Sequence, residues 1–170
     1  PVVSRPIRAM RQVVSDVLAA EEFDVVIAST EMMADYALQA SAGTVRILEE
    51  HNSMTRWMRE RYLAETACLE RLRCWASWQK RRYYDGRSYR RFDLVTMVSE
   101  ADYAATMAAA AEQVRVETVS NGVDCAHNAL ALAQPGPGSL VYSGALTYSV
   151  NYDAMQWFLS EIYPRIRAQA

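Results

Sequence analysis

The sequence predicts an α/β fold, a Rossmann-like parallel sheet with flanking helices. Residues 25–28 (VVIA) form a continuous apolar run that is too short and too rich in β-branched side chains for a helix, and is typical of a buried parallel strand. Segments with apolar residues at three- and four-residue spacing lie between such runs, as in amphipathic helices. Strands that alternate with helices in this way form parallel sheets.

Taken in order, the first part of the chain predicts four strands separated by helices. We expect a helix over 4–20, a strand over 25–28, a helix over 32–39, a strand over 45–48, a helical region over 56–91, a strand over 92–98, a helix over 99–112 and a strand over 114–119. Gly86 is a candidate break in the long helical region. Ser99 and Asp102 have the spacing of a capping box, and Asn121 with Gly122 is a turn signal.

The last part of the chain predicts one strand, one glycine-bearing loop and one helix. Residues 140–142 (LVY) form a short apolar run, and Ser143 and Gly144 end it. Asn151 suits an N-cap, Asp153 would lie in the first turn, and an apolar stripe at helical spacing follows. The stripe consists of Ala154, Phe158, Ile162 and Ile166. A loop that leads into a helix offers backbone N–H groups to a phosphate, and Gly144 lets it approach closely.

These elements predict two domains. Residues 1–120 would form part of a first Rossmann-like domain, and residues 140–170 the first strand-loop-helix of a second. The segment between them, 121–139, ends in PGPGS, a sequence typical of a linker.

Composition excludes several classes of protein. With 51% hydrophobic and 22% charged residues, the 170-residue chain is typical of a globular protein, and no apolar run approaches the roughly 20 residues of a membrane span. Its three cysteines and two histidines lack the spacing of a zinc site or a disulfide scaffold, so we expect no metal and a reducing, cytoplasmic location. Walker, GxGxxG and GxSxG motifs are absent from the sequence.

Polar residues follow each predicted strand, where parallel sheets bind ligands. They are Ser29, Thr30, Glu31, Glu49, Glu50, His51, Asn52, Ser99, Glu100, Asn121, Gly122, Ser143 and Gly144. His51 is the main candidate, because Glu49, Glu50 and Asn52 could fix its tautomer. A structural histidine is the alternative. The glutamates also suggest the carboxylate pair of a glycosidase, although Glu31 and Glu100 are equally explained as first-turn carboxylates.

Positive charge is concentrated in residues 56–91. This range holds eleven basic and four acidic residues, whereas the whole chain has a net charge of -2. Tryptophans and tyrosines lie among the arginines, a combination that suits an anionic lipid surface or a nucleic acid. A solvated helix that buries its aromatic residues on one face is the third interpretation.

Five segments resemble group 1 (family 4) glycosyltransferases of the GT-B fold. They are FDVVIAST at 23–30, RILEEHN at 46–52, FDLVTMVSEADY at 92–103, VSNGVD at 119–124 and LVYSGALTYSVNYDAMQWFLSEIYPRIR at 140–167. The resemblance covers most of the chain. It implies a partial GT-B fold, with the later part of the acceptor-side domain followed by the start of the nucleotide-sugar domain.

The resemblance also implies a function. The parent protein would be a retaining transferase that moves a sugar from a nucleotide-diphosphate donor to a sugar or lipid-linked acceptor, in polysaccharide or glycolipid synthesis, without a metal or cofactor. His51 would hydrogen-bond the transferring sugar, and Ser143, Gly144 and the loop to Asn151 would contact the diphosphate. The resemblance favours the inner face of the membrane over nucleic acid as the binding partner of residues 56–91.

Two family elements have no counterpart in the sequence, namely the glycine-rich loop of the first domain and the paired-glutamate element of the second. We therefore expect the chain alone not to catalyse transfer. A sugar-nucleotide epimerase of similar architecture and a non-catalytic module that binds a membrane or partner are the alternatives.

Overall fold

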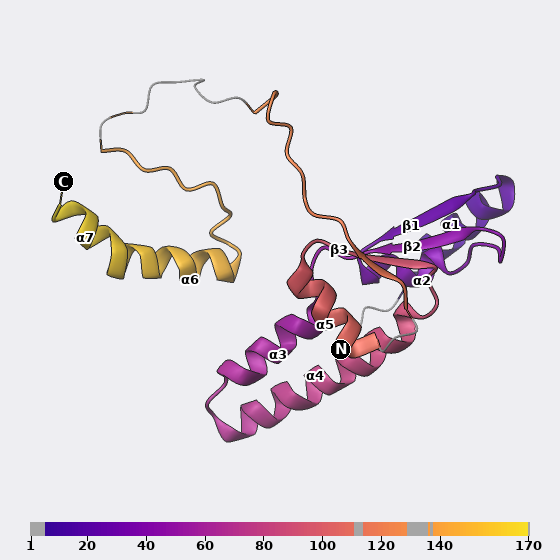
Figure 1. Ribbon diagram of the computed structural model, residues 1–170, viewed down its shortest axis with the longest axis horizontal. Coiled ribbons are helices and arrows are strands. Elements are labelled where there is room, and N and C mark those ends of the chain that lie inside the picture. The colour runs from indigo at the N-terminus through magenta and orange to yellow at the C-terminus, as the bar shows by residue number, and fades with distance from the viewer. Residues whose placement is uncertain (1–5, 111–113, 129–135, 137, 170) are drawn as a thin grey trace. The chain divides into compact units, whose positions relative to one another are not determined.

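The computed structural model describes residues 6–110, 114–128, 136 and 138–169. The chain divides into two compact units, Pro1–Val123 and Asp124–Ala170 (Figure 1). The division lies inside the range 121–139, which the sequence analysis assigns to the linker. The assignment of the two units to an acceptor-side and a nucleotide-sugar domain stays a prediction.

The first unit contains a four-stranded parallel sheet, which confirms the predicted α/β, Rossmann-like class. The strands β1 (Val25–Ser29), β2 (Val45–Glu49), β3 (Leu94–Met97) and β4 (Val116–Thr118) lie side by side in chain order. Parallel neighbours require the chain to return through a crossover. Helices supply each crossover, so all four carboxyl ends meet at one edge of the sheet.

One face of this sheet forms the core. The strand register aligns Ala28 with Leu48, Leu48 with Val95, and Val95 with Val116, and all four side chains are buried. Helices α2 (Ala34–Ala37) and α5 (Glu100–Ala110) pack against the strands. On the alternate positions Val25, Ile27 and Val45 are 44–61% exposed. Hydrophobic burial therefore stabilises the sheet from one side.

The remaining helices of this unit follow the predicted order with different lengths. They are α1 (Arg8–Ala20), the 3-10 turn η1 (Glu31–Met33), α3 (Met54–Ala64) and α4 (Cys68–Tyr89). The predicted helix 32–39 is shorter than expected, because it is divided between η1 and α2. Gly86 does not interrupt α4. It is a buried residue within the continuous helix.

A hydrogen-bonded junction joins the starts of α3 and α5. The Asp102 N–H donates to Ser99 Oγ at 3.2 Å, and Ser99 Oγ donates to Asp102 Oδ2 at 2.6 Å, as the capping-box spacing indicated. Asp102 Oδ1 accepts the Ser53 N–H at 3.1 Å. Burial alone would raise the pKa of Asp102, but the hydrogen bonds from Ser99 and Ser53 favour the carboxylate and hold it below its ordinary value. The end of the predicted helix, 111–112, lies outside the described residues.

The second unit differs from its prediction at the strand and the turn. Residues 140–142 form no strand, because a strand needs a hydrogen-bonded neighbour and the described part of this unit contains none. The turn lies at 125–128 rather than 121–122. Asp124 Oδ1 accepts the Ala126 and His127 N–H groups at 2.9 Å each, which fixes this turn.

The helix of the second unit starts earlier than predicted. It consists of α6 (Ser149–Trp157), the π-helical segment η2 (Phe158–Ile162) and α7 (Tyr163–Arg167). Tyr148 is the N-cap, so Asn151 is not, and Asp153 lies beyond the first turn. The predicted stripe is not buried. Pro164 cannot donate to the carbonyl one turn before it, and the π geometry precedes this residue.

Candidate functional site

The candidate site lies at the carboxyl edge of the parallel sheet. A hollow of about 280 Å³ opens there, and residues from the ends of β2, β3 and β4 line it. They are Glu49, Glu50, His51, Thr96, Val98, Val119, Ser120, Asn121 and Gly122. The structure thus brings together the polar residues predicted after β2 and β4, whereas Thr96 and Val98, and not the predicted Ser99 and Glu100, represent β3 in the hollow. Such an edge is where open α/β sheets hold ligands.

His51 lies in this hollow with a partly accessible ring. Its Nε2 atom is 3.2 Å from Ser29 Oγ and 3.8 Å from Glu49 Oε2, and its side chain is 60% exposed. Ser29 is the last residue of β1, so two neighbouring strands hold the ring. Because Nε2 takes part in these contacts, Nδ1 is the second polar atom that the imidazole can offer a ligand. The tautomer decides which atom donates.

The backbone beside His51 is fixed by bonds that extend the strand pairing. The Thr30 N–H donates to Glu49 O at 2.7 Å, and the Glu50 N–H donates to Thr96 O at 3.0 Å. Thr30 has φ 71° and ψ 157°, a conformation that residues other than glycine rarely adopt. Such strain persists only where neighbouring contacts enforce it. The loop after β1 is therefore held in one conformation, which keeps Ser29 beside His51.

A buried group of charged residues lies next to the site. Arg81 Nη1 is 3.1 Å from Glu31 Oε1 and Arg81 Nε is 2.8 Å from Asp85 Oδ1, and the side chains of Arg81 and Asp85 are 2% and 1% exposed. Thr55 Oγ1 donates to Asp85 Oδ2 at 2.6 Å. Arg81 thereby links α4 to the loop after β1. Arg81 is one of the eleven basic residues of 56–91, but it is buried and cannot contact an anionic surface.

Glu50, which was expected to help fix the tautomer of His51, is instead buried against Tyr89. It is 2% exposed, and its Oε1 accepts the Tyr89 hydroxyl at 3.3 Å. Burial raises the pKa of Glu50 to about 8, with help from the charge of Glu31, although the nearby Arg81 lowers it. At neutral pH the site therefore contains a protonated carboxyl group. Burial, followed by the charge of Glu50, likewise raises the pKa of Tyr89 well above its ordinary value.

A local sequence signal for this buried group existed but was ambiguous. Arg81 and Asp85 are four residues apart on one helix, the spacing of an ion pair on a helix surface. Most such pairs are solvated. Only the approach of Glu31 and Thr55 from other elements shows that this pair is internal.

The predicted diphosphate residues belong to the second unit. Ser143 is exposed, and a Cβ atom added at Gly144 would lie 2.7 Å from the Tyr142 ring, so this glycine accommodates an aromatic side chain. Asn151 Nδ2 donates to Ala145 O at 3.2 Å. Asn151 therefore closes the loop from within α6 instead of capping the helix.

Two classes of feature are absent from the described residues. No group of three or more histidine, cysteine or carboxylate side chains among them could hold a metal ion. No helix in the described ranges has both the length and the apolar character needed to cross a membrane.

No family model, curated protein or solved structure matches the chain.

Proposed function

We propose that this chain is part of a retaining GT-B glycosyltransferase, which transfers a sugar from a nucleotide-diphosphate donor to an acceptor in polysaccharide or glycolipid synthesis. The placement of His51 supports this proposal most directly. Its ring is partly accessible, it lies at the carboxyl edge of a parallel sheet, and Ser29 and Glu49 orient it. An imidazole held in this way can donate a hydrogen bond to a sugar hydroxyl.

The departing nucleoside diphosphate gains negative charge during transfer. Backbone N–H groups and a helix N-terminus stabilise such charge without a metal ion. We assign this role to the loop from Ser143 and Gly144 to the start of α6, as the resemblance implies. Asn151 holds this loop through Ala145 O, so its contribution to donor binding is to fix the loop conformation.

The test is His51→Ala in the complete protein, with His127→Ala as the matched control, because these are the two histidines of the chain. Loss of a hydrogen bond that strengthens in the transition state lowers the rate by about a hundred- to a thousandfold, as for an oxyanion donor. We expect this loss in single-turnover transfer with His51→Ala, unchanged donor affinity, and parental behaviour of His127→Ala. Transfer by His51→Ala at the parental rate would contradict the assignment of His51 to the transferring sugar.

The product separates the two enzyme classes that the sequence leaves open. A transferase places the sugar on an acceptor, whereas an epimerase returns an altered free nucleotide sugar. Chromatography of a reaction with a labelled donor distinguishes these outcomes without knowledge of the linkage.

A second candidate function is contact with an anionic membrane. The hairpin of α3 and α4 exposes Trp57, Leu72 and Trp75, which are 44–59% accessible, beside arginines that include Arg71 and Arg73. Arginines and interfacial tryptophans together suit the headgroup region of anionic bilayers. We propose that the hairpin brings the protein to the cytoplasmic face of the membrane as a peripheral protein.

A further inference from the structure

A groove separate from the His51 site lies among three helices of the first unit. Helices α3, α4 and α5 pack against one another (Figure 1) and leave an opening of about 520 Å³. Arg59, Trp78, Arg82 and a row of alanines are among the residues that line it. The proposed sugar transfer uses none of these side chains.

The groove carries positive charge that the protein does not neutralise. Arg56 at its rim is 2.9 Å from Glu60 Oε1 and 3.3 Å from Asp102 Oδ1. Arg59 and Arg82 are exposed and form no ion pair or hydrogen bond within the described residues. Two arginines that face one opening and lack carboxylate partners are suited to bind a phosphate group.

The walls of the groove are apolar. Ala101, Ala104, Ala105 and Ala108 recur at the spacing of one face of α5, and their small side chains leave a channel instead of a ridge. Trp78 lies opposite, stacked on Tyr62 with 5.7 Å between ring centroids. The buried indole Nε1 of Trp78 has no hydrogen-bond acceptor within the described residues.

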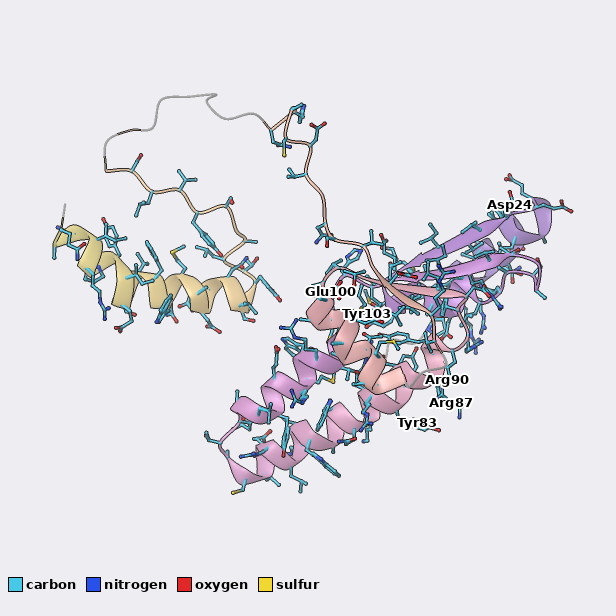
Figure 2. All side chains as sticks on the ribbon, in the orientation of Figure 1. Asp24, Tyr83, Arg87, Arg90, Glu100 and Tyr103 are labelled. Carbon is cyan, nitrogen blue, oxygen red and sulfur yellow. The ribbon has the colours of Figure 1, made fainter. Side chains whose placement is uncertain are left out.

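The groove continues along α4. A second hollow of about 330 Å³ shares Arg82 and Ala109 with the first, and adds Tyr83 and Arg87. Figure 2 shows Tyr83, Arg87 and Arg90 together near the end of α4, and Arg87 Nη1 donates to the Tyr83 hydroxyl at 3.2 Å. Arg82 therefore borders both hollows, and its guanidinium is available to a ligand in either one.

We propose that this groove binds the phosphate headgroup and the first part of the hydrocarbon chain of an anionic membrane lipid. The phosphate would lie between Arg59 and Arg82, and the chain against Trp78 and the alanines of α5. Charge complementarity favours an anionic ligand, and the apolar wall favours an anionic ligand that carries a hydrocarbon tail. This lipid would come from a bilayer, because the α3–α4 hairpin also exposes Trp57, Leu72 and Trp75. Lipid binding here does not depend on glycosyl transfer.

The experiment compares four purified proteins, namely the parent, Arg82→Gln, Ala104→Trp and Lys80→Gln. Arg82→Gln removes the central cation, and Ala104→Trp fills the channel at an exposed position. Lys80→Gln is the matched control, because Lys80 is exposed on the same helix and does not line the groove. Circular dichroism checks that each variant is folded. The probes are decyl phosphate below its micelle concentration, decanol, inorganic phosphate, and phosphatidylcholine vesicles with and without phosphatidic acid.

We expect the parent and Lys80→Gln to bind decyl phosphate and the vesicles with phosphatidic acid, and to bind decanol and inorganic phosphate much more weakly. Arg82→Gln should lose about tenfold or more in affinity for decyl phosphate, as for a lost hydrogen bond to a charged group. Ala104→Trp should lose binding although its charge is unchanged. Equal losses in Lys80→Gln and Arg82→Gln, or parental binding by both groove variants, would overturn the site. Binding of decyl phosphate without binding to vesicles would contradict the proposal that the lipid comes from a membrane.

Discussion

At the scale of single residues, Glu50 links the stability of the protein to pH. Its pKa rises from an ordinary 4.5 to about 8 because it is buried, and the charge of Glu31 adds to this effect. The folded protein therefore holds a proton that the unfolded chain releases above pH 4.5. The stabilisation is complete below pH 4.5 and is lost as pH rises toward 8.

Glu50→Gln tests this linkage, since the amide keeps an oxygen for the Tyr89 hydroxyl and cannot ionise. Between pH 4.5 and about 8 we expect the free energy of unfolding of the parent to fall by about 1.4 kcal/mol for each pH unit. The free energy of unfolding of Glu50→Gln should depend less on pH. Urea unfolding across this pH range measures the difference. Glu22→Gln, at an exposed position, should keep the parental slope. A parental slope in Glu50→Gln would mean that another group carries the linkage.

Arg81 and Arg82 are adjacent in sequence and opposite in role. Arg81 forms ion pairs with Glu31 and Asp85 inside the protein, whereas Arg82 is exposed at the groove. Removal of one member of a buried ion pair leaves an uncompensated charge and costs about 3–5 kcal/mol. We expect Arg81→Met to lower the free energy of unfolding by this amount and Arg82→Met to change it by about 0.5 kcal/mol or less. Equal urea midpoints for the two variants would refute the internal role of Arg81.

At the scale of an element, the α3–α4 hairpin is the part that we expect to contact lipid. Substitution of Leu72 and Trp75 by serine removes exposed apolar area that would insert among headgroups. We expect this double variant to float less with anionic vesicles. Added salt should also weaken binding by the parent, because the Debye length shortens from about 8 Å at physiological ionic strength.

The control for the hairpin variant changes two comparably exposed side chains of the first unit, Ile7 before α1 and Val13 within it, to serine. This control should float as well as the parent. Equal flotation of all three proteins would favour the solvated-helix interpretation of 56–91. Arg82→Gln, in contrast, should reduce phosphate recognition and leave the exposed tryptophans in place.

At the scale of the whole molecule, the sequence predicted those elements whose signals are local. The apolar run of β1 and the Ser99 cap of α5 depend on neighbouring residues, and both predictions are confirmed. Residues 140–142 carry a similar apolar run but form no strand, since pairing depends on a distant partner. The buried role of Arg81 was missed for the same reason, because Glu31 approaches it from fifty positions away in sequence.

The candidate site was predictable in part. Parallel strands align their carboxyl ends, so the pattern alone placed His51 near Asn121 and Gly122, and the structure finds all three around one hollow. The partnership of His51 with Ser29 and the protonation of Glu50 depend on side-chain packing and burial, which no sequence pattern specifies. The proposed sugar and diphosphate contacts stay predictions.

The absence of buried side chains from the described part of Asp124–Ala170 has a thermal consequence. Fully packed proteins absorb about 0.7 kcal/mol per residue on melting near 60 °C, because melting separates packed groups. Within the described residues, the buried side chains all belong to Pro1–Val123. Differential scanning calorimetry of the 170-residue chain should therefore give an enthalpy per residue about a quarter below that value, with one cooperative heat-absorption peak. An unfolding enthalpy of about 0.7 kcal/mol per residue, averaged over the whole chain, would contradict this expectation.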